Sequence, residues 1–148
     1  MFRKRKTDSS AENGLWDPTV VSPVSPGYPQ LGPGLYVTSV SLIGGRKNQQ
    51  DVLDYRPLQG GGLAAVLCDG MGGCSNGKAA SAAVVKTMYD CYKAYTSSQI
   101  DQPAHFLRAA ASQGNKLVAQ ILDGKVGGTT IVAAMIQNRQ LYWFSAGD

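Results

Sequence analysis

Histidine and cysteine, which build most zinc and thiol sites, are scarce in this sequence. There is one histidine, His105, and there are three cysteines, Cys68, Cys74 and Cys91. The cysteines are odd in number and lack metal-ligand spacing, so we expect reduced thiols rather than a disulfide framework. His105 has no second histidine or cysteine near it, and we expect it to lie on the surface of a helix.

Long apolar runs are also absent. No stretch approaches the roughly 18 apolar residues of a membrane-spanning helix, and the N-terminus lacks the apolar region of a signal peptide. We therefore expect a cytoplasmic protein with no membrane span. An apolar content of 43% over 148 residues is nevertheless enough for one domain with a hydrophobic core.

Excess charge is confined to one short cluster. The formal net charge is +4, and the four basic residues at 3–6 alone account for that value. The rest of the chain is near neutral, which argues against nucleic acid as a partner. Residues 1–34 also hold five of the seven prolines and no apolar period. We expect 1–34 to be a disordered basic, proline-rich segment and 35–148 to be the folded part.

The folded part begins with strand-like patterns. Residues 35–43 alternate and are rich in β-branched side chains, which predicts a strand. A polar segment at 46–51 and a turn region at 55–62 follow, and the apolar run 63–68 then predicts a buried strand. Two strands in succession with a short connection favour an antiparallel pair.

Two stretches with helical periodicity come next. The first helix is predicted by apolar residues spaced three or four apart, namely Ala80, Val84, Met88, Cys91 and Tyr95. The second is expected to begin with an Asp101 cap and Pro103 and to end at Gly124. Its predicted apolar face consists of Phe106, Leu107, Ala110, Leu117, Val118 and Ile121.

The last part of the sequence predicts a β-hairpin. Residues 129–136 and 141–146 are both strongly apolar, and Asn138-Arg139 can turn the chain between them. Because both strands are apolar along their length, we expect both of their faces to be covered.

The most informative stretch chemically is Asp69-Gly70-Met71-Gly72-Gly73, between the second predicted strand and the first helix. A carboxylate followed by glycines suits a hard cation, because the glycines let backbone carbonyls and ligands come close. The same residues also suit a simple strand-to-helix turn. A third interpretation is a nucleotide-binding phosphate loop, since residues 72–78 fit G-x-x-x-x-G-K. Against it, Ala79 stands where that motif has Ser or Thr, and the neighbouring elements resemble hairpins.

A family resemblance starts from this stretch. Residues 69–73, with Gly77 and Ala80-Ser81, resemble the D-G-M-G-G-x-x-x-G-x-x-A-S signature of the metal-dependent protein phosphatases of the PPM type (type 2C). The segment 44–51 resembles the R-x-x-N-[EQ]-D segment of that family; the corresponding residues are Arg46, Gln49, Gln50 and Asp51. Residues 127–130 resemble its G-T-T strand, and 146–148 its G-D, which continues in the family as G-D-S-R. These four motifs stand in the order of the family.

The resemblance implies a fold and an activity. The fold is α+β, an antiparallel β-sandwich flanked by helices in α-β-β-α layers, here incomplete at the C-terminus. The activity is hydrolysis of phosphoserine and phosphothreonine in proteins, with two Mn²⁺ or Mg²⁺ ions as cofactors. The implied partners are phosphorylated protein substrates and a Ser/Thr kinase pathway.

The resemblance also assigns roles to single residues. It implies that Asp69 bridges the two metals, that the Gly70 carbonyl binds one of them, and that Asp51 holds a water of the metal centre. It makes Arg46 the group that receives the substrate phosphate and places Asp148 near a further metal position. The residue types agree, because carboxylate and carbonyl oxygens suit hard cations and a guanidinium matches phosphate bidentately.

The sequence also departs from the family. Cys74 stands where many bacterial members have His, Lys78 where Glu is usual, and Gln50 where many have Glu. The larger departure is length, because the remaining metal-binding aspartates of the family follow G-D-S-R. We therefore expect the 148-residue chain alone to be inactive. The alternative to an enzyme is an incomplete or inactive relative that binds a phosphoprotein or another partner without turnover.

Overall fold

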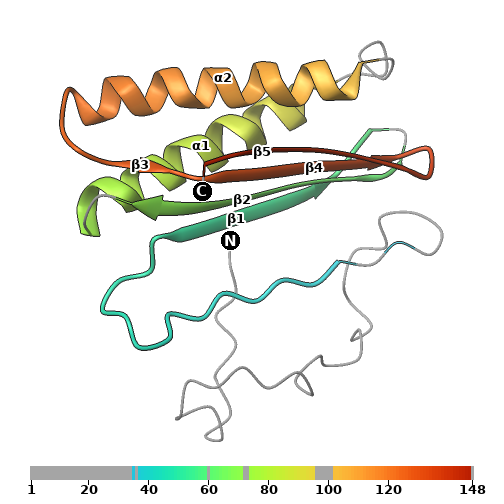
Figure 1. Ribbon diagram of the computed structural model, residues 1–148. Helices are drawn as coiled ribbons and strands as arrows, with labels where there is room; N and C mark the ends of the chain where they lie inside the picture. Colours follow the sequence, from blue (N-terminus) through green and yellow to red (C-terminus); the bar gives the residue numbers. More distant parts are fainter. Residues whose placement is uncertain (1–34, 36, 60, 72–73, 96–101, 148) are drawn as a thin grey trace, which may run out of the picture.

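The computed structural model describes residues 35, 37–59, 61–71, 74–95 and 102–147. In this part of the chain, two helices lie on one face of an antiparallel sheet (Figure 1). The elements in chain order are β1 (Asp51–Pro57), β2 (Leu63–Met71), α1 (Cys74–Ala94), α2 (Pro103–Leu122), β3 (Gly128–Thr129), β4 (Ile131–Gln137) and β5 (Gln140–Ala146). The α+β class and the antiparallel sheet are confirmed, and the described residues form one sheet of the expected sandwich.

The strand order in the sheet is β1-β2-β4-β5, and the short β3 pairs with the end of β2. β2 is therefore an inner strand, and β1 and β5 are the outer strands of this path. The predicted hairpin is confirmed as β4 and β5, which turn at Asn138 and Arg139 with φ of 52° and 61°. Two successive positive φ values match the twist that a two-residue hairpin turn requires.

The prediction of a strand at 35–43 is wrong. None of its described residues lies in a strand, and Val40, Leu42 and Ile43 are exposed. The partner of β2 is β1, which covers part of the segments expected to be a polar loop and a turn. The tight turn explains this pairing, because Leu58 N–H donates to Gly62 O and Gly61 N–H to Leu58 O. A partner only a few residues away closes the smallest loop, which costs the least conformational entropy.

The hydrophobic core lies between the sheet and the helices. It combines residues from the sheet with the α1 stripe, chiefly Ala64, Val66, Cys68, Ala133, Met135, Ala80, Val84 and Met88. The predicted α1 stripe is confirmed, since four of its five residues are buried and Cys91 is half-buried. Neither described helix is long and apolar enough to cross a bilayer.

The second helix follows its prediction with two changes. The residue before the helix is Gln102, whose side chain makes no capping hydrogen bond, while Asp101 lies outside the described residues. Ile121 is 44% exposed, and Leu122 is buried in its place. At the other end, Asp123 adopts the left-handed conformation and its N–H donates to Ala119 O, so the helix ends at Leu122, two residues before Gly124.

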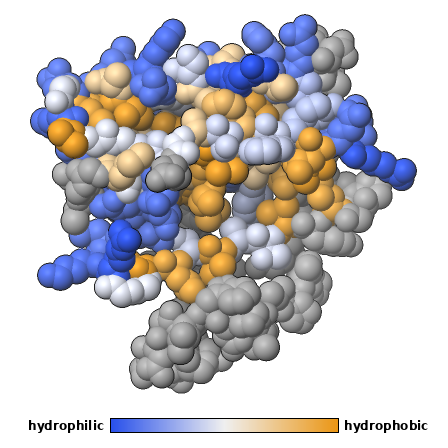
Figure 2. Space-filling view, viewed as in Figure 1, coloured by the Kyte–Doolittle hydropathy of each residue, from blue (hydrophilic) through white to orange (hydrophobic). Residues whose placement is uncertain are grey.

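The sheet face away from the helices is open in the described part of the chain. The register places Leu67, Val132, Trp143 and Leu141 on this face, and all four are exposed, Trp143 by 65%. Apolar side chains accordingly reach the surface at the level of the sheet (Figure 2). The expectation that both faces of the hairpin are covered is therefore wrong for these residues, because only the helix-facing side is packed.

Candidate functional site

Two carboxylates meet where β1 begins and β2 ends. Asp51 and Asp69 are register partners, and at the next position Gly70 N–H donates to Gln50 O at 3.3 Å. Asp51 and Asp69 are therefore the non-hydrogen-bonded pair of the ladder, the arrangement that brings opposite Cα atoms to roughly 4.5 Å and their side chains closest together. Cross-strand partners share a face of the sheet, so both carboxylates project to the side away from the helices.

The carboxylates interact electrostatically. The pKa of Asp51 is raised chiefly by burial, and then by a hydrogen bond to Asp69 and by charge repulsion with Asp69; the positive charge of Arg46 acts in the opposite direction. Two like charges at close range resist full ionisation. A bound cation removes that repulsion and displaces protons, so the pair has the electrostatics of a cation site.

The backbone of Asp69 is fixed from the side of β3. Thr130 N–H donates to Asp69 O at 2.9 Å, and Asp69 N–H donates to Thr130 Oγ1 at 3.1 Å. The Thr129 hydroxyl is a second donor to Asp69 O, also at 2.9 Å. Both backbone groups of Asp69 are thus engaged, and its carboxylate projects from a fixed point. No role for these two threonines was predicted, although the G-T-T resemblance pointed to their segment.

Two glycines of the motif allow the end of β2 to pack directly on α1. A Cβ on Gly70 would lie 2.2 Å from Gly77 O, and one on Gly77 would lie 2.8 Å from the carbonyl carbon of Gly70. Neither position can carry a side chain without movement of the backbone. The strand-to-helix turn and the carboxylate pair are therefore parts of one arrangement.

The phosphate-loop interpretation is wrong. α1 begins at Cys74, so Gly77 and Lys78 already lie inside the helix, and only two residues separate its start from the end of β2. The strands that pair with β2 are antiparallel, whereas a phosphate loop belongs to a βαβ unit.

Arg46, Asp51 and Asp69 line one cavity of about 340 Å³, to which Lys47 and Gln50 also contribute. Three of the predicted site residues, from two strands and the preceding loop, thus lie around the same space. Their roles stay predictions, but the geometry combines two carboxylates with a guanidinium. Such a cavity can hold a cation and a phosphate together, because each offsets the charge of the other.

Gln49 fastens the loop that carries Arg46. Its Nε2 donates to Ser41 Oγ at 2.8 Å and to Leu42 O at 3.2 Å. Its Oε1 accepts from Asp51 N–H at 3.3 Å. The side chain therefore links the loop to the first residue of β1. The family segment has Asn at this position, and the bridging role of the longer Gln was not predicted.

Two predicted metal ligands stay untested by the geometry. Asp148 lies outside the described residues, and the described residues hold nothing that tests the Gly70 carbonyl as a ligand. Among the described residues, no group of three His, Cys, Asp or Glu side chains is placed to hold a metal ion. The oxygen-only donors Asp51 and Asp69 fit Mn²⁺ or Mg²⁺ in kind, but they are fewer than such an ion requires.

The thiols described by the structure do not belong to the site. Cys68 and Cys91 are free, which confirms the expectation for these two. Burial raises the pKa of Cys68 to about 12, so its thiol is protonated and unreactive at neutral pH. His105 is exposed on α2, as expected.

Comparisons with known proteins identify the family of this chain. The sequence model of the family described as Protein phosphatase 2C matches residues 41–148. A search of curated proteins found no match. Among solved structures, a bacterial serine phosphatase is 26% identical with a TM-score of 0.63; the match covers 70% of this chain and 43% of that chain. A single-residue variant of a bacterial serine phosphatase is 25% identical with a TM-score of 0.62; the match covers 70% of this chain and 49% of that chain.

The serine/threonine phosphatase PstP/Ppp of Mycobacterium tuberculosis is also similar. It is 25% identical with a TM-score of 0.57, and the match covers 70% of this chain and 42% of that chain. This chain therefore spans less than half the length of each of these solved structures.

Proposed function

This chain belongs to the protein phosphatase 2C family, and we propose that it forms the N-terminal part of a metal-dependent protein serine/threonine phosphatase domain. The observation that carries the proposal is the pairing of Asp51 with Asp69 in a cavity that Arg46 also lines. Because the chain covers less than half of its solved relatives, we propose the activity for a domain of full family length.

The proposed metal centre uses Asp69 as the shared ligand, together with the Gly70 carbonyl, and Asp148 near a further position. Mn²⁺ or Mg²⁺ ions bound there would supply a water of lowered pKa and would stabilise negative charge on the phosphoryl group. The proposal is supported by the oxygen-only donor set, which suits these ions better than softer metals.

The remaining chemistry falls to side chains of this chain. The Arg46 guanidinium binds two phosphate oxygens and so fixes the phosphorus relative to the carboxylates. Asp51 accepts a hydrogen bond from the attacking water and orients it. No covalent nucleophile is required, which agrees with the high pKa of the buried Cys68 thiol. The proposed substrates are phosphoproteins of a Ser/Thr kinase pathway, and the proposed location is the cytoplasm.

A second candidate is a module that binds phosphoproteins without turnover. It is favoured by one observation, namely that the described residues bring together only two acidic side chains at the site. A hard cation takes six or more oxygen ligands, so this part of the domain supplies too few for tight binding. The 148-residue chain alone is accordingly proposed to be inactive.

The two candidates differ in one assay. In a chain extended to full family length, we measure Mn²⁺-dependent hydrolysis of a phosphothreonine peptide. The enzyme proposal requires turnover that is lost in Asp69→Asn, and an Arg46→Ala variant whose KM rises. Binding of the peptide without turnover in the extended wild-type chain would favour the binding module instead. Full activity in Asp69→Asn would exclude the proposed metal centre.

A further inference from the structure

Ser81 is fully buried in α1, and its hydroxyl reaches across to the start of β1. Its relative exposure is 0%, and Oγ donates to Gln50 O at 2.7 Å. That carbonyl precedes Asp51 and also accepts the N–H of Gly70, the residue after Asp69. One carbonyl oxygen thus joins α1, β1 and β2 directly behind the two carboxylates.

The serine hydroxyl does not require the hydrogen bond to Gln50 in order to be satisfied. A helical serine hydroxyl can satisfy itself on a carbonyl of the preceding turn, and Lys78 O lies 3.2 Å from Ser81 Oγ. The hydroxyl has one proton, and the shorter contact is the one to Gln50, 31 residues away in sequence. The two distances therefore favour the hydrogen bond of Ser81 to the start of β1 over one within α1.

The two carboxylates differ in how their backbones are held. Asp69 lies in an inner strand and is fixed by Thr129 and Thr130. Asp51 is the first residue of an outer strand and follows a loop. Strand ends of this kind open locally at little cost in free energy. The separation of the carboxylates thus depends chiefly on what fixes the backbone at Gln50 and Asp51.

We propose that Ser81 is a positioning residue for the cation site: its hydrogen bond to Gln50 O keeps the Asp51 carboxylate within reach of a cation held by Asp69. This inference rests on the proposed function. Groups that orient metal ligands without touching the metal typically change metal affinity by 10–100-fold when they are removed.

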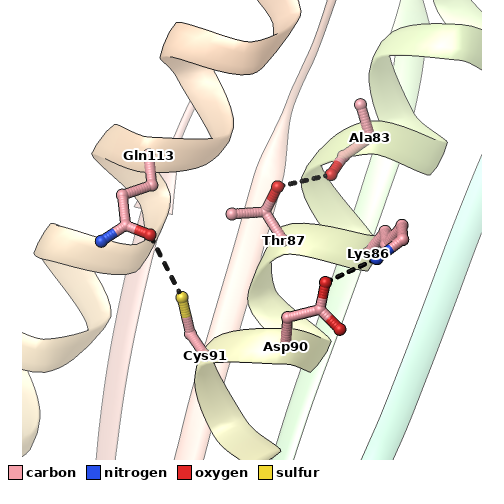
Figure 3. Close-up of polar contacts among 6 residues, drawn as sticks. All are labelled: Ala83, Lys86, Thr87, Asp90, Cys91 and Gln113. Carbon is pink, nitrogen blue, oxygen red and sulfur yellow. Dashed lines mark hydrogen bonds and ion pairs between the residues drawn. The ribbon is translucent and has the colours of Figure 1, made fainter. Parts of the chain in front are cut away.

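The test is a Mn²⁺ titration of a chain extended to full family length, in which the electron paramagnetic resonance signal of free Mn²⁺ reports binding. We compare the wild type with Ser81→Ala, Asp69→Asn and a matched control, Thr87→Val. Thr87 also lies on α1, and its hydroxyl donates only within the helix, to Ala83 O at 2.9 Å (Figure 3). Ser81→Ala should weaken Mn²⁺ binding about 10-fold or more, and Thr87→Val should leave it unchanged.

Each other outcome has a definite meaning. If Asp69→Asn weakens binding but Ser81→Ala does not, Ser81 has no positioning role and the proposed metal centre stands. If Thr87→Val weakens binding as much as Ser81→Ala, the effect is general destabilisation and the inference is wrong. If the wild type binds no Mn²⁺, or binds it independently of Asp69, the metal centre and the inference fall together.

A second variant covers failure of Ser81→Ala to fold, which far-UV circular dichroism would reveal. Ser81→Cys fills the position with a thiol, a weaker hydrogen-bond donor than a hydroxyl. Reduced Mn²⁺ affinity in this folded variant supports the inference, and wild-type affinity overturns it.

Discussion

Thr130 and Asp69 exchange two hydrogen bonds: Thr130 N–H donates to Asp69 O at 2.9 Å, and Asp69 N–H donates to Thr130 Oγ1 at 3.1 Å. The second bond replaces a backbone partner with a side-chain hydroxyl, at the point where the sheet passes from β3 to β4. The threonine side chain therefore completes the ladder next to the central carboxylate of the site.

This bond predicts the effect of removing the hydroxyl. Thr130→Val leaves Asp69 N–H without its acceptor and should lower the free energy of unfolding by about 1 kcal/mol. Urea denaturation measures the change. Thr130→Ser keeps the acceptor and is the matched control, so an equal loss in both variants would contradict this role of the hydroxyl.

The raised pKa of Asp51 should depend on Asp69. Burial is its largest cause, a hydrogen bond to Asp69 and charge repulsion with Asp69 come next, and Arg46 opposes them. In the metal-free chain, Asp69→Asn should therefore move the pKa of Asp51 down toward 3.8, the ordinary value. The ¹³C chemical shift of the Asp51 carboxyl carbon, followed against pH, measures it. An unchanged pKa would show that the carboxylates do not interact.

The raised pKa of Asp51 also determines how the stability of the fold changes with pH. A carboxyl whose pKa is raised on folding binds its proton more tightly in the folded state. Its contribution to stability is fully present below the ordinary pKa of 3.8 and is lost as pH rises through the raised value. Thermal unfolding of the metal-free wild type should show this loss. Asp51→Asn, which cannot titrate, should lack that part of the pH dependence.

Two helical glycines should respond oppositely to alanine. A Cβ on Gly77 would lie 2.8 Å from the Gly70 carbonyl carbon and the Met71 nitrogen, so Gly77→Ala forces backbone movement. Overpacking of this kind costs about 1–3 kcal/mol. On Gly114 the nearest atoms are the Val84 methyl carbons at 3.4 Å, an ordinary contact. Gly114→Ala should therefore be neutral or gain up to about 1 kcal/mol of helix propensity. Urea denaturation that ranks the two variants in the reverse order would contradict the close approach of β2 to α1.

Local patterns were sufficient to predict some elements. The apolar run at 63–68, the α1 stripe and the β4–β5 hairpin each follow from residues close together in sequence. The mistake at 35–43 shows the limit, because alternation predicts a strand without saying whether a partner exists. β1 was missed because Asp51, Asp54 and Arg56 make it look polar, although antiparallel edge strands accept polar residues.

Local sequence patterns also predicted only part of the candidate site. Resemblance to the family singled out Arg46, Asp51 and Asp69, and the residue types alone pointed to a hard cation at Asp69. The register that sets Asp51 opposite Asp69 is a tertiary property. The hydrogen bonds of Ser81 and Gln49 also join residues that sequence patterns treat as separate. Ser81 was already part of the family signature in the sequence, and only the structure shows the partner of its hydroxyl.

The most direct test of the cation site is a ¹H–¹⁵N nuclear magnetic resonance spectrum of the 148-residue chain during addition of Mn²⁺. A paramagnetic ion broadens the signals of nearby amides. We expect the amides of Asp51, Asp69 and Gly70 to broaden first and Asp69→Asn to abolish this selectivity. Broadening that begins at exposed Asp90 on α1, or that stays the same in Asp69→Asn, would show that the paired carboxylates are not a cation site.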